Sequence, residues 1–229
     1  MPSTIEQSLY RLQTWFSPSF PIGSYTYSHG LENAHETGLI TDVAQAIDWI
    51  ESIISSGDAF ADVVFISHAY RAVNERSSVH LKPLAEFATA FCATKEFRLE
   101  SESQGAAFIE VIQNIERNAG LEMLLETWPG PYPYSVALGC AAGSLDIGEN
   151  ATVNAFLHAY VSNLSSALVR IVPFGQTDGQ RIIAALASSV VVSATKAQST
   201  ILEELTTATI MVDLTSMNHE SQYTRLFRS

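Results

Sequence analysis

The apolar positions of this chain recur at steps of three and four residues along most of its length. One stripe between about residues 151 and 172 predicts a long helix with Asn150 as its N-cap. A second stripe, between Ile183 and Leu205, predicts another long helix with Asp178 as its cap. No segment shows sustained alternation of apolar and polar residues, so we expect no β-sheet.

Earlier segments follow the same helical period. Residues 43–54 carry one apolar stripe, and either Thr41 or Asp42 suits the N-cap of that helix. Residues 60–70 are apolar nearly all round, which is typical of a central helix. A rigid proline-rich break precedes a short apolar helix that begins at about Tyr134. The pattern predicts a single all-α domain, a helical bundle that spans residues 1–229.

Composition narrows the range of partners. Hydrophobic residues make up 47% of the 229 residues, so we expect a wide apolar core. Charged residues make up 16%, below the usual share of ~25%, so we expect a partner to cover part of the surface. The formal net charge of −12 argues against binding to nucleic acid or to anionic membranes. The apolar stretch 182–194 is too short and too serine-rich to span a bilayer, and the N-terminus lacks a signal-peptide pattern, so we expect a cytoplasmic protein.

Motifs of catalysis or cofactor binding do not stand out. The chain has no Gly-x-Ser-x-Gly elbow, no HExxH, no P-loop and no GxGxxG. Cys92 and Cys140 lie far apart and form no CxxC pair. We therefore expect no catalytic residue, no cofactor and no metal site.

One alternative stays open around a group of histidines and acids. If a helix capped by Ser24 or Ser28 ran through this segment, His29, Glu32 and His35 would lie near one face. Imidazole and carboxylate are competent ligands for nickel or zinc. The alternative function is a helical metal carrier or enzyme that uses these three residues, with Cys140 as a further candidate ligand. Ordinary polar residues on an exposed helix are the commoner explanation of such a group.

Three segments depart from the helical pattern. Residues 16–32 combine two prolines, two glycines and four aromatic residues in a non-periodic stretch. Residues 170–178 contain a proline and a glycine that separate the two long helices. The tail from about residue 213 ends in Tyr, Leu, Phe and Arg, and the types Tyr, Phe and Arg are enriched at protein interfaces.

Together, the motifs FPIGSYTYSHGLE, RIVPFGQTDGQ and MNHESQYTRLFRS resemble those of the UreF family of urease accessory proteins. The resemblance implies an all-α homodimer of about ten helices that is not itself an enzyme. It also implies a protein that bridges a UreD/UreH-like accessory protein and the UreG-like GTPase, and so delivers nickel to apo-urease.

The resemblance also implies two sets of site residues. The dimer and GTPase surface would include Tyr25, Arg170, Val172, Pro173, Phe174 and Gly175. The UreD/UreH surface, or the fold of the tail, would include Met217, His219, Glu220, Tyr223, Arg225, Leu226 and Phe227. In the family the tail is mobile alone and orders against UreD/UreH, so we expect a partner-binding C-terminal tail from about residue 213.

Overall fold

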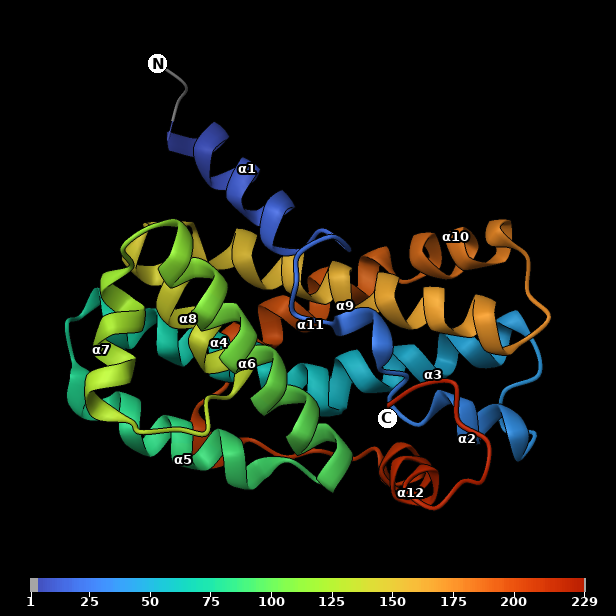
Figure 1. Cartoon of the computed structure of the whole chain (residues 1–229). Coiled ribbons are helices and arrows are strands. Elements are labelled where there is room, and N and C mark those ends of the chain that lie inside the picture. The colour runs from blue at the N-terminus through green and yellow to red at the C-terminus, as the bar shows by residue number, and fades with distance from the viewer. Residues whose placement is uncertain (1–3, 229) are drawn as a thin grey trace.

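The computed structural model describes residues 4–228, and within that range the regular structure is entirely helical. The α-helices, labelled in Figure 1 where room allows, are α1 Thr4–Trp15, α2 Leu31–Glu36, α3 Val43–Ser56, α4 Asp58–Asn74, α5 Leu81–Phe91, α6 Lys95–Ile115, α7 Ala119–Thr127, α8 Tyr134–Ser144, α9 Glu149–Ile171, α10 Gln176–Ala185, α11 Ala187–Ser199 and α12 Ile210–His219. Short 3-10 turns cover Ser24–Thr26, Ser78–His80 and Leu202–Glu204. The prediction of an all-α fold is confirmed.

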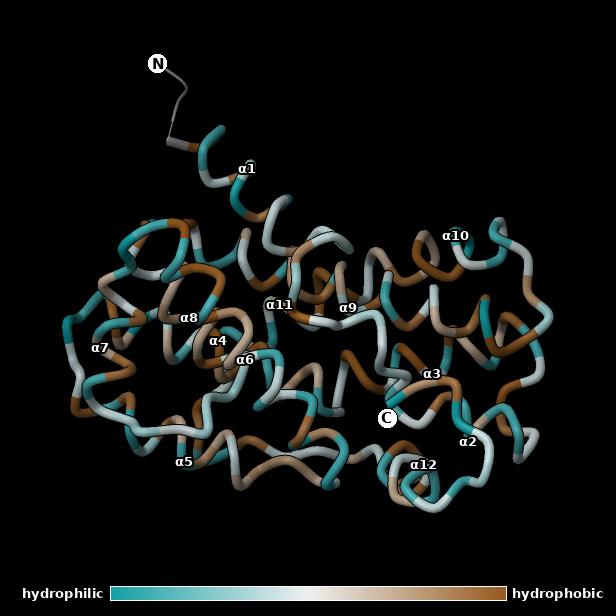
Figure 2. The backbone as a smooth tube through the Cα atoms, in the orientation of Figure 1, coloured by the Kyte–Doolittle hydropathy of each residue, from teal (hydrophilic) through white to brown (hydrophobic). Residues whose placement is uncertain are grey.

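Helix α4 lies at the centre of the bundle. It packs against α3, α5, α8, α9 and α11, and most of its residues are buried on every side. The prediction that its nearly uniform apolar sequence marks a central helix is therefore confirmed. Hydrophobic positions recur as short bands along the other helices (Figure 2), as expected where each helix buries one stripe.

The close crossing of α4 and α8 depends on glycine. A Cβ atom added at Gly139 of α8 would collide with the backbone oxygen of Ile66, and one at Gly143 would lie 2.8 Å from the backbone oxygen of Tyr70. These two glycines lie one helical turn apart, so they form a groove into which the α4 backbone fits.

Helix ends agree with some of the predicted caps. Asp42 caps α3, since its carboxylate accepts a hydrogen bond of 2.9 Å from the backbone N–H of Gln45. The prediction of Asn150 as a cap was wrong, because α9 begins at Glu149, after Gly148. At α10 the N-cap is Gly175, and Asp178 acts from the first turn by accepting the Gly175 N–H at 3.0 Å.

The second long helix was also predicted wrongly. It is two helices, α10 and α11, which meet at Leu186 with a bend of 44°. Buried positions continue through the bend from Ile182 through Leu186 to Val190 and Ala194. Both helices pack against α9 and α3, so the apolar stripe faces the body on either side of the bend.

The N-terminal helix projects away from the body, whereas the C-terminal residues lie against it. Helix α1 projects from the body (Figure 1); Leu12 and Trp15 bury its last turn, while Ile5 and Leu9 are exposed. The C-terminal residues run back past α2 towards the turn at Ser24–Thr26. Across residues 4–228 no single helix has both the length and the apolarity to cross a bilayer, and only the bent pair α10–α11 meets that test jointly, by length and composition.

Candidate functional site

The three segments singled out in the sequence meet around one side chain, Arg170. Its Nη2 atom donates a 3.0 Å hydrogen bond to the backbone oxygen of Tyr25, and its guanidinium lies 4.4 Å from the centre of the Phe227 ring. Beside it, the backbone N–H of Arg228 donates to the backbone oxygen of Thr26 at 2.8 Å. We call Tyr25, Arg170 and Phe227 the Arg170 junction. It joins three segments: the non-periodic stretch at residues 16–32, which we call the N-terminal loop, the end of α9, and the C-terminal tail.

The residues expected at the dimer and GTPase surface differ in accessibility. Tyr25 is exposed, and so are Pro173 and Gly175. Val172 is buried, and Phe174 is half-buried against the core. The turn after α9 therefore presents its backbone and proline outward and directs its two apolar side chains inward.

A second cluster holds the tail to the body through His219, which has no exposed surface. Its Nδ1 lies 3.0 and 3.1 Å from the two carboxylate oxygens of Glu96, and its Nε2 lies 3.2 Å from Glu32. We call Glu32, Glu96 and His219 the His219 clamp. Glu32 and Glu96 occupy the first turns of α2 and α6, and His219 the last turn of α12, so each charge has the sign that its helix end favours.

The clamp also holds the backbone beyond α12. Glu32 accepts the N–H groups of Leu226 at 2.6 Å and Phe227 at 3.1 Å, and Arg225 lies 3.4 Å from Glu96. Burial alone would lower the pKa of His219, but its hydrogen bonds to Glu96 and Glu32 outweigh burial and raise that pKa. The raised pKa and the two neighbouring carboxylates thus favour the imidazolium form of His219.

The close approach of α12 to α2 also needs a glycine. Gly30 has a φ of +73°, and a Cβ atom there would lie 2.6 Å from Thr215 Oγ1 and 2.7 Å from the Ser216 backbone nitrogen. Glycine at this position lets α12 sit directly on the start of α2, where it brings His219 to Glu32.

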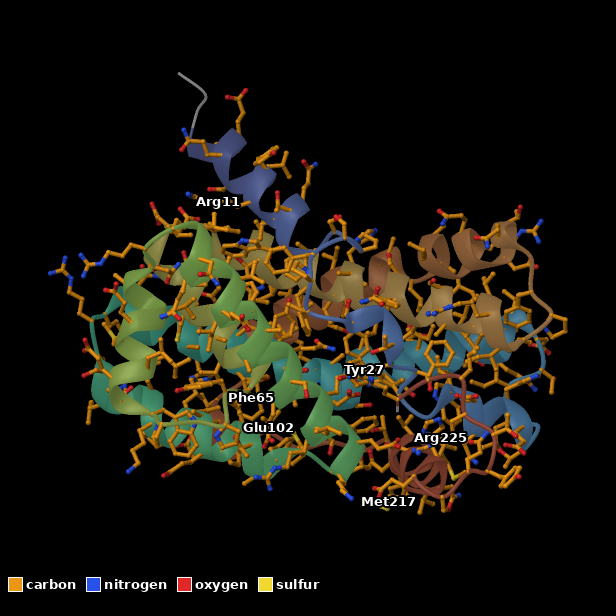
Figure 3. The ribbon with its side chains drawn as sticks, in the orientation of Figure 1. Arg11, Tyr27, Phe65, Glu102, Met217 and Arg225 are labelled. Atoms are coloured by element: carbon orange, nitrogen blue, oxygen red, sulfur yellow. The ribbon has the colours of Figure 1, made fainter. Side chains whose placement is uncertain are left out.

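The tail residues expected to contact UreD/UreH separate into two groups. Buried against the chain itself are His219 and Phe227, of which Phe227 is 5% exposed. Exposed are Met217, Glu220, Tyr223, Arg225 and Leu226. Met217 and Arg225 both lie on the side of the molecule that carries α12 (Figure 3). Two of the seven expected residues, His219 and Phe227, thus pack against the chain itself, and the other five face outward.

The alternative metal site is not assembled. His29 precedes α2 in a left-handed turn with a φ of 51°, so it does not share a helix face with Glu32. Glu32 binds the tail, and His35 Nδ1 lies 2.9 Å from the backbone oxygen of Ile40. Cys140 is fully buried in α8. Within residues 4–228 no group of three or more His, Cys, Asp or Glu side chains is placed to hold a metal ion.

His29 instead belongs to a buried polar network. Its Nδ1 lies 3.1 Å from Asp58 and its Nε2 lies 3.0 Å from Glu100, while the Tyr160 hydroxyl donates to Asp58 at 2.6 Å. We call these four residues the His29 network. Burial would lower the pKa of His29, but Glu100 and Asp58 more than offset burial and raise it to about 10. His29 is therefore a charged cross-link between the N-terminal loop, α4 and α6.

A cavity of about 100 Å³ adjoins this network. Among the groups that line it are Asp62, Asp213 and Tyr134, whose buried hydroxyl has no hydrogen-bond partner. Burial and the neighbouring Asp58 carboxylate raise the pKa of Asp62 to about 7. The face of α4 that carries Asp58 and Asp62 is thus acidic, although apolar side chains such as Phe65 and Phe156 line the same cavity.

Comparison with known proteins places the chain in a family. The family model described as UreF matches residues 40–187. The chain belongs to the UreF family of urease accessory proteins. A urease accessory protein UreF of Rhodopseudomonas palustris (strain BisB5) is 45% identical over 230 residues, which cover 100% of this chain and 95% of the relative. The same-named protein of Bradyrhizobium diazoefficiens is 44% identical over 222 residues, 97% of this chain and 92% of the relative.

In this UreF-family chain, sequence reasoning missed the acidic partners of the two histidines. Asp58, Glu96 and Glu100 lie in helices whose sequences look ordinary, and they meet His29 and His219 only through the fold. The one local signal is that Asp58 and Glu96 occupy the first turns of their helices. That position is also common for acids that contact nothing else.

Proposed function

We propose that the chain is a non-catalytic scaffold that binds a UreD/UreH-like accessory protein and a UreG-like GTPase, so that nickel is inserted into apo-urease. Family membership supports a role in urease maturation. The observation that carries the bridging role is the Arg170 junction, since it ties two separate exposed surfaces into one unit.

The first surface surrounds the turn after α9 and would receive the GTPase and a second copy of this chain. It consists of Tyr25, Arg170 and the turn from Val172 to Gly175. The exposed ring of Tyr25 and the exposed backbone at Pro173 and Gly175 are available to a partner, while Val172 and Phe174 anchor the turn from inside. A homodimer would place two such surfaces about one two-fold axis.

The second surface is the outer side of the tail and would receive the UreD/UreH-like protein. Met217, Tyr223 and Leu226 expose large apolar groups there, and Arg225 adds a planar donor. Glu220 is exposed beside them, whereas His219 and Phe227 shape the tail from beneath. Apolar anchors next to arginine are typical of the residues that dominate binding energy at interfaces.

Co-expression of these proteins in the cytoplasm of a urease-producing host, followed by pull-down from the lysate, tests this proposal. We expect the wild-type chain to capture the UreD/UreH-like protein, the UreG-like GTPase and apo-urease. Arg170→Ala should retain the accessory protein and lose most of the GTPase, and Tyr223→Ala should lose the accessory protein. Arg181→Ala is the matched control, because Arg181 is an exposed arginine whose ion pair with Asp178 stays within α10.

Two outcomes would contradict the proposal. One is a chain that captures neither partner when all components are expressed together. The other is equal capture by the Arg170→Ala, Tyr223→Ala and Arg181→Ala variants, since the two surfaces would then have no role in binding. Helical circular dichroism of each variant separates loss of binding from loss of folding.

A further inference from the structure

Both ring nitrogens of His219 face carboxylates. Three carboxylate oxygens lie between 3.0 and 3.2 Å from them, two from Glu96 and one from Glu32. A neutral imidazole carries one N–H, so it can donate to one of these carboxylates and must turn a lone pair towards the other. When both carboxyl groups are ionised, the arrangement is therefore fully satisfied by the imidazolium form.

The carboxylates that hold His219 also hold the tail. Glu32 accepts two backbone N–H groups from residues 226 and 227, and Glu96 lies within reach of Arg225. We propose that His219 is a protonation-dependent latch for the terminal segment, residues 220–228. Its imidazolium form keeps the segment on the body, and loss of the proton releases the segment.

The charged groups around His219 determine the direction of this effect. Glu32 faces it from α2 and Glu96 from α6, while Arg225 of the terminal segment competes for Glu96. Lys95, Glu220 and Arg228 line the hollow beside Glu96 and Arg225. The two carboxylates that contact the ring directly favour its protonated form. Because the pKa of His219 is raised by docking, the latch is fully closed below the ordinary histidine pKa of about 6.5 and opens as the pH rises through the raised value.

Release would change what the tail offers to a partner. Phe227 would leave its place under Arg170, and the apolar groups of the segment would become free to pack elsewhere. If the proposed function is right, the docked segment is the surface that the UreD/UreH-like protein binds, so capture should be weaker above the His219 transition than below it. This consequence rests on the proposed function, whereas the latch itself is a property of the isolated chain.

Amide hydrogen exchange on the full-length chain tests the latch without any partner. The reporters are the backbone amides of Leu226 and Phe227, which donate to Glu32. The Gln45 amide is a matched internal control, because it donates to the Asp42 carboxylate with no histidine involved. We would measure protection factors from pH 6 to pH 10, corrected for intrinsic exchange, and follow the His219 ring by NMR in the same samples.

We expect protection at Leu226 and Phe227 to fall with the same midpoint as the ring titration, while protection at Gln45 stays constant. Proton linkage determines how large the change is. For every unit by which docking raises the pKa of His219, the equilibrium constant for docking of residues 220–228 should fall tenfold across the titration. His219→Gln should show low protection at every pH and no transition. His158→Gln, at an exposed histidine of α9, should keep the wild-type transition.

The latch is refuted if protection at residues 226 and 227 does not follow the ring titration, or if Gln45 loses protection in parallel. It is also refuted if His219→Gln retains the transition with an unchanged midpoint. Should His219→Gln fail to fold, as judged by circular dichroism, the wild-type comparison alone decides. Failure of partner capture with an intact transition would contradict the proposed function and leave the latch standing.

Discussion

Single side chains in this protein carry charge into places that would otherwise be apolar. His29 and His219 are both almost fully buried, and each is held by two carboxylates from different helices. A buried ion pair adds less stability than its Coulomb energy suggests, yet removing one partner is costly because the other charge is left behind. These two residues therefore fix where the N-terminal loop and α12 sit, more than they add to overall stability.

Ionisation of Asp62 should destabilise the folded chain, whereas ionisation of most protein carboxylates stabilises it. The pKa of Asp62 in the folded chain is about 7, above the value of 3.8 expected when unfolded, so ionisation opposes folding increasingly between about pH 4 and pH 7. Asp62→Asn should therefore raise the melting temperature at pH 8, with a gain of up to about 4 kcal/mol for a pKa difference of about 3, and have little effect near pH 4.

Thermal melts of wild type and variant across this pH range check the prediction. Asp48→Asn, at an exposed position of α3, is the control and should change little at either pH. If Asp62→Asn lowers the melting temperature at pH 8 as much as at pH 4, the carboxylate is stabilised by contacts that outweigh its burial.

At the residue scale, spacing predicted which side chains are unusual but not what they contact. His29, Glu32 and His35 stood out, and each does hold a structural contact, but three different ones. One left-handed residue before α2 was enough to take His29 off the helix. The partners Glu100 and Glu96 lie 71 and 123 positions away from the histidines they bind, and no local pattern carries that information.

At the element scale, periodicity predicted α3 and α9 because each buries an apolar stripe against α4. It failed at Leu186, since the buried positions keep the same spacing through the bend and nothing in the pattern marks the break. It also did not predict that α8 would pack through glycine. The sequence of α8 is simply apolar. Its contact with the α4 backbone is possible because Gly139 and Gly143 have no side chains there.

The α4–α8 crossing makes Gly139 a sensitive position. In Gly139→Ala the added methyl would meet the Ile66 backbone, which cannot move aside as a flexible side chain could. We expect a loss of about 1–3 kcal/mol in the free energy of unfolding, the usual range for overpacking a core. Chemical denaturation measures this value. Gly148→Ala is the control, because a Cβ at Gly148 meets nothing within 4 Å; an equal loss in both variants would contradict the close-packing argument.

At the scale of the whole molecule, the three segments that the helical pattern left unexplained lie together. The N-terminal loop and the tail are about 200 positions apart in the sequence, and both contact Arg170 at the end of α9. A sequence can show that such segments are unusual, but their meeting depends on α9 carrying Arg170 to the place where the chain's two irregular ends cross. This convergence makes the tail part of the fold as well as a candidate surface for partners.

Truncation at two positions separates these two roles of the tail. Removal of residues 221–229 leaves α12 and His219 in place but takes away Tyr223, Leu226 and Phe227. We expect this chain to stay folded, because His219 keeps Glu96 and Glu32, and to lose capture of the UreD/UreH-like protein. Removal from Met217 also deletes His219, which leaves the Glu32 and Glu96 carboxylates without their buried cation.

The longer truncation should therefore be the less stable of the two, by about 3–5 kcal/mol if both carboxylates stay buried and less if they reach water. Melting temperature and pull-down, measured on both truncations, give the comparison. Equal stability would mean that the His219 clamp contributes nothing to holding α12. Capture of the UreD/UreH-like protein by the shorter truncation at wild-type yield would remove the exposed tail from the proposed binding surface. In that case Met217 and the outer face of α12, where Met211 and Leu214 are also exposed, would be what the partner contacts.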